Sequence, residues 1–208
     1  MMLEIRAIQN WEAEQWVLRK HYAKRMPPIS YAFGLYDRIN LIGVVTYGFP
    51  ASRALCRGIC GEAWVDQVLE LNRLVLADNV SNHASILVGR SLRMLPKPRI
   101  VVSYADTAQG HVGYVYQATN WLYTGLSAKR FDSKMPDGET RHSRTLGWVK
   151  GAELVERSRK HRYVFFLGNK KEIKEFRRLL NYGIEPYPKG DSRRYDASAT
   201  VETQMLLI

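Results

Sequence analysis

Two charged residues stand where the surrounding sequence predicts buried strands, so we consider them first as candidates for chemistry. Arg73 interrupts the apolar segment Val68–Leu76, and a charge there is costly unless it meets a carboxylate or a ligand anion such as a phosphate. Asp106 ends a β-branched run that begins at Arg99. A carboxylate in that position can accept a proton during a reaction, or it can cap the helix that follows.

A further polar pair, His21 and Tyr22, follows the first predicted helix. Together with Asp106 or His111 it would supply nitrogen and oxygen ligands of the kind that suits non-haem iron, although no spacing here matches a recognised metal motif. For His21 the functional interpretations are a base, a DNA contact or a metal ligand. The structural interpretation is a buried, hydrogen-bonded histidine.

The elements that must position these residues alternate along the chain. Strands are expected at 3–8, 31–36, 41–47, 68–76, 99–104, 122–130, 142–148 and 162–167. Helices are expected at 10–20, 83–95, 111–121, 153–159 and 170–181, and a loop at 132–140. This order predicts an α/β protein with a mixed sheet and helices on both faces.

The composition predicts one soluble domain over residues 1–208. The chain has 208 residues and a formal net charge of +11, and 46% of its residues are hydrophobic. No apolar run approaches the ~20 residues needed to span a bilayer, so no membrane partner is expected. The first residues lack a secretion signal, which favours the cytoplasm, and Cys56 and Cys60 are interpreted as two reduced, partly buried thiols.

Most of the excess charge lies late in the chain. Residues 129–194 contain 18 basic and 9 acidic residues, a net charge of +9, so we expect residues 129–208 to contact a polyanion such as DNA. The expected phosphate contacts are Lys171, Lys174, Arg177, Arg178, Arg193 and Arg194. Tyrosines at 182, 187 and 195 could stack on bases. A basic surface that is simply solvated is the alternative.

The order of elements is similar to that of the GNAT acetyltransferase fold. In that fold the strands before and after the first central helix separate to hold acetyl-CoA, and the pyrophosphate sits on amides at the helix N-terminus. The matching loop here reads Asn-Val-Ser-Asn-His-Ala at 79–84, without the family's glycines. The resemblance implies cofactor contacts from Ser81, Asn82 and Ala84, and Ser91 also falls at a functional family position. Arg73, considered above from its charge, would bind a phosphate of the cofactor or a substrate carbonyl. An ordinary helix capped by Ser81 or Asn82 is the alternative.

A more specific resemblance rests on Ser-Tyr-Ala-Asp at 103–106, Gly-His-Val-Gly at 110–113 and Tyr-Gln-Ala-Thr-Asn-Trp-Leu-Tyr-Thr-Gly at 116–125. These segments resemble the Mom family of phage DNA-modification proteins, a branch of the acetyltransferase superfamily. The resemblance implies an enzyme that adds a carbamoylmethyl group to the exocyclic amino group of adenine in double-stranded DNA. Such a modification would protect phage DNA from restriction in the host cytoplasm.

The resemblance also implies roles for single residues. Asp106 would accept a proton from the adenine amino group or orient that group, and Tyr116 would protonate a leaving thiolate of CoA. His21 and Tyr22 join them as catalytic candidates, with acetyl-CoA and non-haem iron as the implied cofactors and a homodimer as a compatible assembly. A core tyrosine with a satisfied hydroxyl is the structural alternative for Tyr116.

Two other functions remain open at this point. One is an acetyl-CoA-dependent transferase acting on a small amine or a protein, and the other is a DNA-binding relative that has lost catalysis. Simple acetyl transfer joins nitrogen to a carbonyl carbon, whereas a carbamoylmethyl group is joined through its methylene. Acetyl transfer therefore cannot be the whole reaction that the Mom resemblance implies.

Overall fold

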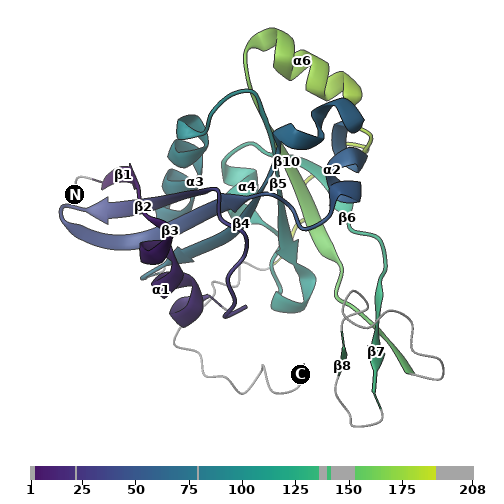
Figure 1. The fold of residues 1–208 in the computed structure, drawn as a ribbon, viewed down its shortest axis with the longest axis horizontal. Helices are drawn as coiled ribbons and strands as arrows, with labels where there is room; N and C mark the ends of the chain where they lie inside the picture. Colours follow the sequence, from purple (N-terminus) through teal and green to yellow (C-terminus); the bar gives the residue numbers. More distant parts are fainter. Residues whose placement is uncertain (1–2, 22, 79, 136–139, 142–152, 191–208) are drawn as a thin grey trace.

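The main sheet of the computed structural model has seven strands in the order β1-β2-β3-β4-β5-β10-β6 (Figure 1). The structure describes residues 3–21, 23–78, 80–135, 140–141 and 153–190. The strands are β1 (Leu3–Ala7), β2 (Tyr31–Asp37), β3 (Asn40–Gly48), β4 (Val68–Leu76), β5 (Arg99–Asp106), β6 (Leu122–Leu126) and β10 (Lys160–Leu167). Only β4 and β5 pair in parallel, and the other neighbours are antiparallel. The predicted mixed sheet is confirmed.

Helices cover both faces of this sheet. The α-helices are α1 (Asn10–Lys20), α2 (Arg53–Cys60), α3 (His83–Met94), α4 (Tyr114–Ala118) and α6 (Lys170–Leu179), and the 3-10 helices are η1 (Glu62–Gln67) and η2 (Thr107–Gln109). One core joins α3 and α4 to residues such as Val45 and Leu69. The other face packs α2 and α6 against residues such as Val68 and Val102, and α1 against Val44. Successive strand residues thus point to opposite cores, as the pleat of a strand requires.

The second sheet is small and projects beyond the first (Figure 1). It consists of β7 (Phe131–Lys134), β8 (Thr140–Arg141) and β9 (Glu153–Glu156) in the order β8-β7-β9. The predicted helix at 153–159 is therefore wrong, because Glu153–Glu156 pairs antiparallel with β7. The expected strand at 142–148 lies outside the described residues. Among those described, no helix is both long and apolar enough to cross a membrane.

The expected strand at 122–130 ends at Leu126, and β7 and β8 take up parts of the expected loop at 132–140. Two further differences concern helices. The helix expected at 111–121 is reduced to α4, because Gly113 (φ 81°) and Asn120 (φ 61°) take left-handed backbone conformations on either side of it. A continuous helix tolerates no such residue. The sequence analysis also misses the helix α2. The side chain of its N-cap, Ser52, accepts a hydrogen bond from Leu55 N, and its inner face buries both cysteines and Ile59.

Candidate active site

The parallel strands β4 and β5 separate after a short paired stretch. They pair only from Val68 to Glu70 on β4 and from Ile100 to Val102 on β5. At the first position beyond, the Ser103 hydroxyl donates to the Leu71 carbonyl oxygen at 2.8 Å. The remaining residues of both strands, including Arg73 and Asp106, therefore lie at the open carboxyl ends. This is the strand separation that the acetyltransferase resemblance implies.

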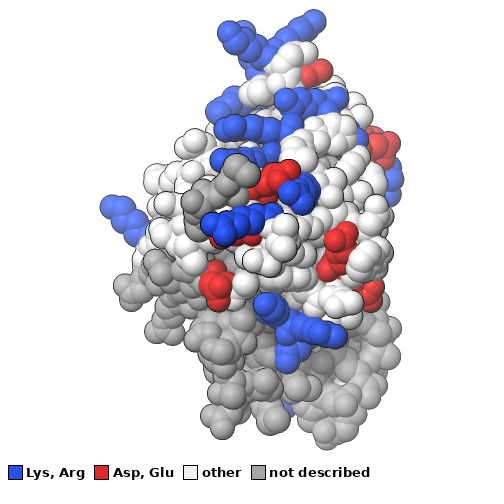
Figure 2. All heavy atoms as spheres, turned by 90° about the vertical axis from the view of Figure 1, so that its left-hand side faces the viewer, with Lys and Arg blue, Asp and Glu red and all other residues white. Residues whose placement is uncertain are grey.

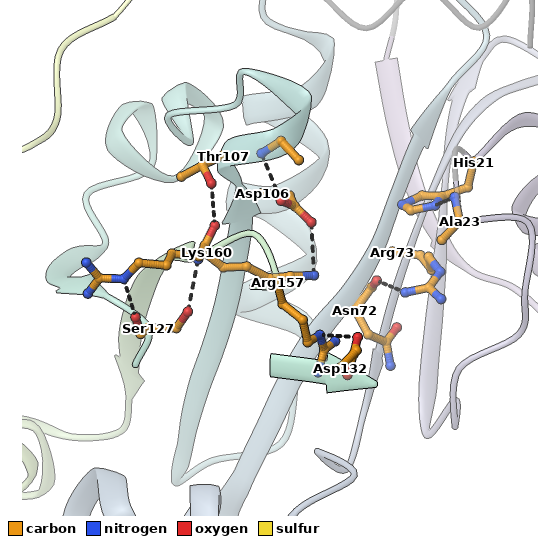
Figure 3. Close-up of polar contacts among 12 residues, drawn as sticks. His21, Ala23, Asn72, Arg73, Asp106, Thr107, Ser127, Asp132, Arg157 and Lys160 are labelled. Atoms are coloured by element: carbon orange, nitrogen blue, oxygen red, sulfur yellow. Dashed lines mark hydrogen bonds and ion pairs between the residues drawn. The ribbon is translucent and has the colours of Figure 1, made fainter. Parts of the chain in front are cut away.

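Asp106 is held at both carboxylate oxygens (Figure 3). Its Oδ1 accepts a hydrogen bond from Ala108 N at 3.0 Å and so caps η2. Its Oδ2 lies 3.1 Å from Nζ of Lys160, and the Asp106 side chain is 13% exposed. The interpretation of Asp106 as a helix cap is confirmed. The ion pair with Lys160 holds the second carboxylate oxygen, which capping does not use.

Lys160 is a site residue that the sequence analysis misses. The register of β10 against β5 places Lys160 directly opposite Asp106. Nothing in the local sequence marks this lysine, because the two residues are brought together only by an antiparallel pairing of distant segments. The only available signal is the clustering of cations at 157–162, which composition alone does not resolve.

His21 is buried beside two other site residues. It is 8% exposed, and its Nδ1 accepts a hydrogen bond from Ala23 N at 3.0 Å. Burial lowers the pKa of His21 to about 3, with smaller contributions from the positive charge of Arg73 and from His111. The ring is therefore neutral at pH 7, and since Nδ1 accepts, its proton is on Nε2. The buried, hydrogen-bonded interpretation is confirmed, while Tyr22 lies outside the described residues.

The low pKa of His21 predicts a loss of stability in acid. Between pH 6.5 and 3 the unfolded chain protonates this histidine and the folded chain does not, so unfolding takes up a proton. Stability should fall as pH decreases below 6.5, by at most about 1.4 kcal/mol per pH unit from this group. Urea unfolding at pH 7 and pH 5 measures the change. His21→Asn should reduce the difference between the two pH values, and an unchanged difference would contradict the assignment.

The residues around His21 do not fit an iron site. In the described part of the chain no group of three or more His, Cys, Asp or Glu side chains is arranged to hold a metal ion. The same positive charge of Arg73 that lowers the pKa of His21 also disfavours a metal cation there. We therefore assign no step to iron.

A bulge changes the direction of Arg73. The register with β3 passes from Thr46–Arg73 to Tyr47–Leu71, which leaves Asn72 as an extra residue. Arg73 therefore shares a face with Thr46 and not with Leu71, whose side chain enters the α3 core. The Arg73 guanidinium donates to the main-chain oxygens of Asn72 at 2.6 Å and Arg25 at 3.0 Å. These carbonyls hold the guanidinium in place, and its predicted contact with a ligand anion stays a prediction.

Tyr116 lies in the core where the strands separate. It is 7% exposed, its ring packs on Trp121 and Tyr163, and its hydroxyl lies 2.7 Å from Oγ of Ser103. The predicted satisfied core tyrosine is confirmed. A serine hydroxyl has one proton, so Ser103 can donate either to the Leu71 carbonyl or to Tyr116. This pair could therefore accommodate loss of the Tyr116 proton, which leaves the predicted acid role chemically open.

Ser91 has a structural environment. It is fully buried on α3, and its hydroxyl donates to the Val88 carbonyl at 3.1 Å and lies 2.7 Å from the Tyr47 hydroxyl. Burial raises the pKa of Tyr47, with a smaller contribution from Tyr116. Ser91 therefore connects α3 to β3, and its cofactor contact stays a prediction.

The N-terminus of α3 has no cap from its N-cap side chain. Asn82 is the N-cap, with a left-handed backbone (φ 68°), and its side chain makes no capping hydrogen bond. The alternative in which the Asn82 side chain caps this helix is therefore wrong, since a left-handed N-cap does not have the extended backbone that directs the side chain to the first turn. Ser81 is exposed and Ala84 lies in the first turn. His83, which directly follows Asn82, is 5% exposed, and its Nε2 has no hydrogen-bond partner among the described residues.

The basic face of α6 lies away from Asp106. The side chains of Lys171, Lys174, Arg177 and Arg178 are exposed, while Phe176 is buried as predicted. Figure 2 shows Lys and Arg side chains gathered at the top of the molecule, the level of α6 in Figure 1. Along β10, Lys160 pairs with Asp106 and Leu167 pairs with Arg99. Seven steps of strand, ~23 Å, therefore separate the start of the α6 connection from the Asp106 end.

The other expected DNA contacts have different outcomes. Arg193, Arg194 and Tyr195 lie outside the described residues. The centre of the Tyr182 ring lies 3.4 Å from Cζ of the Arg162 guanidinium. The Tyr187 hydroxyl donates to the Trp121 carbonyl oxygen at 2.7 Å. Both tyrosines thus have intramolecular partners, and their stacking on bases stays a prediction.

The sheet order, the separating β4–β5 pair and the polar groups at its open end define a mixed α/β protein with an acetyltransferase-like architecture. A family model described as the Mom protein family matches residues 2–189. The chain belongs to the Mom protein family.

The chain is also similar to individual proteins. The chain is 29% identical over 206 residues to the methylcarbamoylase Mom of Escherichia phage Mu, an alignment that covers 90% of this chain and 84% of that protein. A GNAT family acetyltransferase from Bacillus cereus is 9% identical, with a TM-score of 0.45 over 80% of this chain and 98% of that one. Arabidopsis thaliana NAA60 in complex with acetyl-CoA is 11% identical, with a TM-score of 0.49 over 80% of this chain and 100% of that one.

Proposed function

We propose that this protein is a phage DNA-modification transferase that adds a carbamoylmethyl group to the exocyclic amino group of adenine in double-stranded DNA. The observation that carries the proposal is Asp106, which is fixed by Ala108 N and Lys160 at the open end of the separated strands. Membership of the Mom family and the similarity to a protein named methylcarbamoylase support this choice. The modification would protect phage DNA from restriction inside the host.

The proposed chemistry assigns proton transfer to Asp106. The adenine amino group is conjugated with the ring and is a poor nucleophile, so removal of its proton helps it to attack. The contacts to Ala108 and Lys160 fix the carboxylate, which reduces the reorganisation needed at the moment of transfer. The buried His21 stays neutral and keeps a proton on Nε2, so it can donate a hydrogen bond near Arg73. Tyr116 would supply a proton to a departing group.

The separated strands and the N-terminus of α3 fit acetyl-CoA. A neighbouring structure, NAA60, is described in complex with that cofactor. The α3 amides that the Asn82 side chain leaves uncapped suit a pyrophosphate, with Ser81 and Ala84 beside them. Acetyl-CoA, when bound, supplies an activated acyl group. Because the proposed product is joined through a methylene, its formation requires a reaction in addition to acetyl transfer.

Mass spectrometry of nucleosides tests the proposal directly. DNA from bacteria that express the full chain should contain a deoxyadenosine that is heavier by one carbamoylmethyl group in place of one hydrogen. Unmodified deoxyadenosine under verified expression would overturn the proposal. Acetyl-CoA turnover on small amines without DNA would instead indicate the acetyltransferase alternative, and DNA binding without modification would indicate a non-catalytic relative.

We further expect the basic face of α6 to strengthen DNA binding without contacting the reacting base. Replacing Lys171, Lys174, Arg177 and Arg178 by alanine should weaken affinity in low salt and reduce the slope of log K against log salt. The reduction is about 0.9 for each lost phosphate contact, or roughly 3 to 4 in total. Fluorescence anisotropy at several salt concentrations measures both effects.

Arg53→Ala provides a control for the loss of an exposed cation at another helix, because the Arg53 side chain is 70% exposed. It should leave the slope nearly unchanged. An unchanged slope in the α6 variant would show that the α6 cations are only a solvated surface.

A further inference from the structure

The small sheet is attached to the main sheet at the same end as Asp106. Ser127 N donates to the Lys160 carbonyl at 2.8 Å, and Thr107 N donates to the Arg159 carbonyl at 3.2 Å. Thr107 directly follows Asp106, and Lys160 is paired with Asp106. The chain that leaves β6 for β7 and the chain that returns from β9 to β10 therefore both pass the open end of β5 (Figure 1).

These two connecting segments are basic. They are residues 127–130 and 157–160, which contain Lys129, Arg130, Arg157, Arg159 and Lys160 and no acidic residue. Arg130 is exposed, and the Lys129 side chain is 64% exposed and lies 3.5 Å from the Glu156 carboxylate. Arg157 and Lys160 are paired with Asp132 and Asp106 at 3.1 Å each (Figure 3). Lys129 and Arg130 are thus the cations best placed to reach phosphates from this end.

A large apolar side chain is exposed directly beside those cations. Phe131 begins β7 and is 45% exposed. The pairings Phe131–Glu156 and Ser133–Leu154 place Phe131 and Leu154 on one face of the small sheet, and Leu154 is also 45% exposed. An exposed phenyl group next to Arg130, at the end of the molecule that carries the proposed catalytic residue, has the chemistry of a DNA-intercalating wedge.

We propose that Phe131 inserts into the duplex and fills the space that the target adenine leaves when it is extruded, while Lys129 and Arg130 bind the flanking phosphates. This inference rests on the proposed function, because adenine in a duplex must be flipped out before its amino group can react. Unstacking costs a few kcal/mol, and a phenyl ring that stacks on the neighbouring bases in the vacated space offsets part of that cost. From Ser127 beside Lys160, four residues of chain reach Phe131, a span of at most ~13 Å.

The test measures base extrusion without chemistry. Duplexes that carry 2-aminopurine at the target position should become more fluorescent when the full chain binds, because an unstacked 2-aminopurine is no longer quenched. At saturating protein, Phe131→Ala should reduce this increase at least fivefold, and Phe131→Leu should restore much of it. Ile39→Ala is the matched control, since Ile39 is an exposed apolar residue (87% exposed) at the β2–β3 turn, and it should behave as wild type.

A second measurement uses modification itself. Phe131→Ala should lose most activity on a paired adenine and keep most of it on an adenine opposite an abasic site, where no base pair must be broken before the adenine leaves the duplex. Equal fluorescence, or equal loss on both substrates, would overturn the wedge. A Phe131-dependent fluorescence increase without any modified nucleoside would support the wedge and contradict the proposed chemistry, so the two failures are distinguishable.

Discussion

Replacing Asp106 by asparagine is expected to reduce DNA modification by at least about 100-fold, the lower range for loss of a general base. The asparagine side chain keeps an oxygen that can accept the Ala108 N–H, so the cap of η2 survives. It lacks the negative charge that pairs with Lys160 and cannot take a proton from an amine. The modified nucleoside measured by mass spectrometry should nearly disappear, while the affinity for DNA stays within a few fold of wild type.

Asp132→Asn is a closely matched control for this variant. The Asp132 carboxylate is 14% exposed and pairs with Arg157 at 3.1 Å, much as Asp106 is 13% exposed and pairs with Lys160 at 3.1 Å. Asp132 lies on β7 and not at the end of β5, so the control loses one comparable ion pair and is expected to keep most of the modification activity. If Asp106→Asn also retained activity, Asp106 would be only a helix cap.

Local patterns were sufficient to predict most strands and helices of the main sheet. The stripe that buries Phe176 and the β-branched run of β5 depend on neighbours along the chain, and both were predicted. The helix predicted at 153–159 is wrong because Glu153–Glu156 pairs with β7, a distant segment. The local sequence pattern does not show that pairing. Tertiary pairing overrides weak local preference in such a short charged segment.

The same distinction applies to the candidate site. Asp106 and Tyr116 lie within the segments that resemble the Mom family, and the structure places both at the separation of β4 and β5. The contact of Lys160 with Asp106 depends on the register between β5 and β10, which the sequence does not give. The direction of the Arg73 side chain depends on a bulge that no sequence pattern predicts. Net charge favours a polyanionic partner but does not show where the cations lie relative to Asp106.

Gly113→Ala is expected to destabilise the fold by about 3 kcal/mol, from backbone strain and overpacking together. Gly113 has φ 81°, and a Cβ there would lie 2.5 Å from Cε2 and 2.8 Å from Cζ of the Tyr163 ring. That ring cannot move freely, because its hydroxyl donates to the Val112 carbonyl and it packs on Tyr116. Urea unfolding measures the loss.

Gly61→Ala is a control for backbone strain without a clash. Gly61 has φ 90° and ψ 176°, a backbone region that is essentially restricted to glycine, and a Cβ there would meet nothing within 4 Å. We expect this variant to cost about 1 to 3 kcal/mol from backbone strain alone and to keep its modification activity while it stays folded. In Gly113→Ala the added Cβ would lie 3.0 Å from Cδ2 of Tyr116, so that variant should displace Tyr116 and lower modification activity even where the protein stays folded. Equal modification activity in the two folded variants would show that Tyr163 yields to the added methyl group, and Tyr116 would then keep its position.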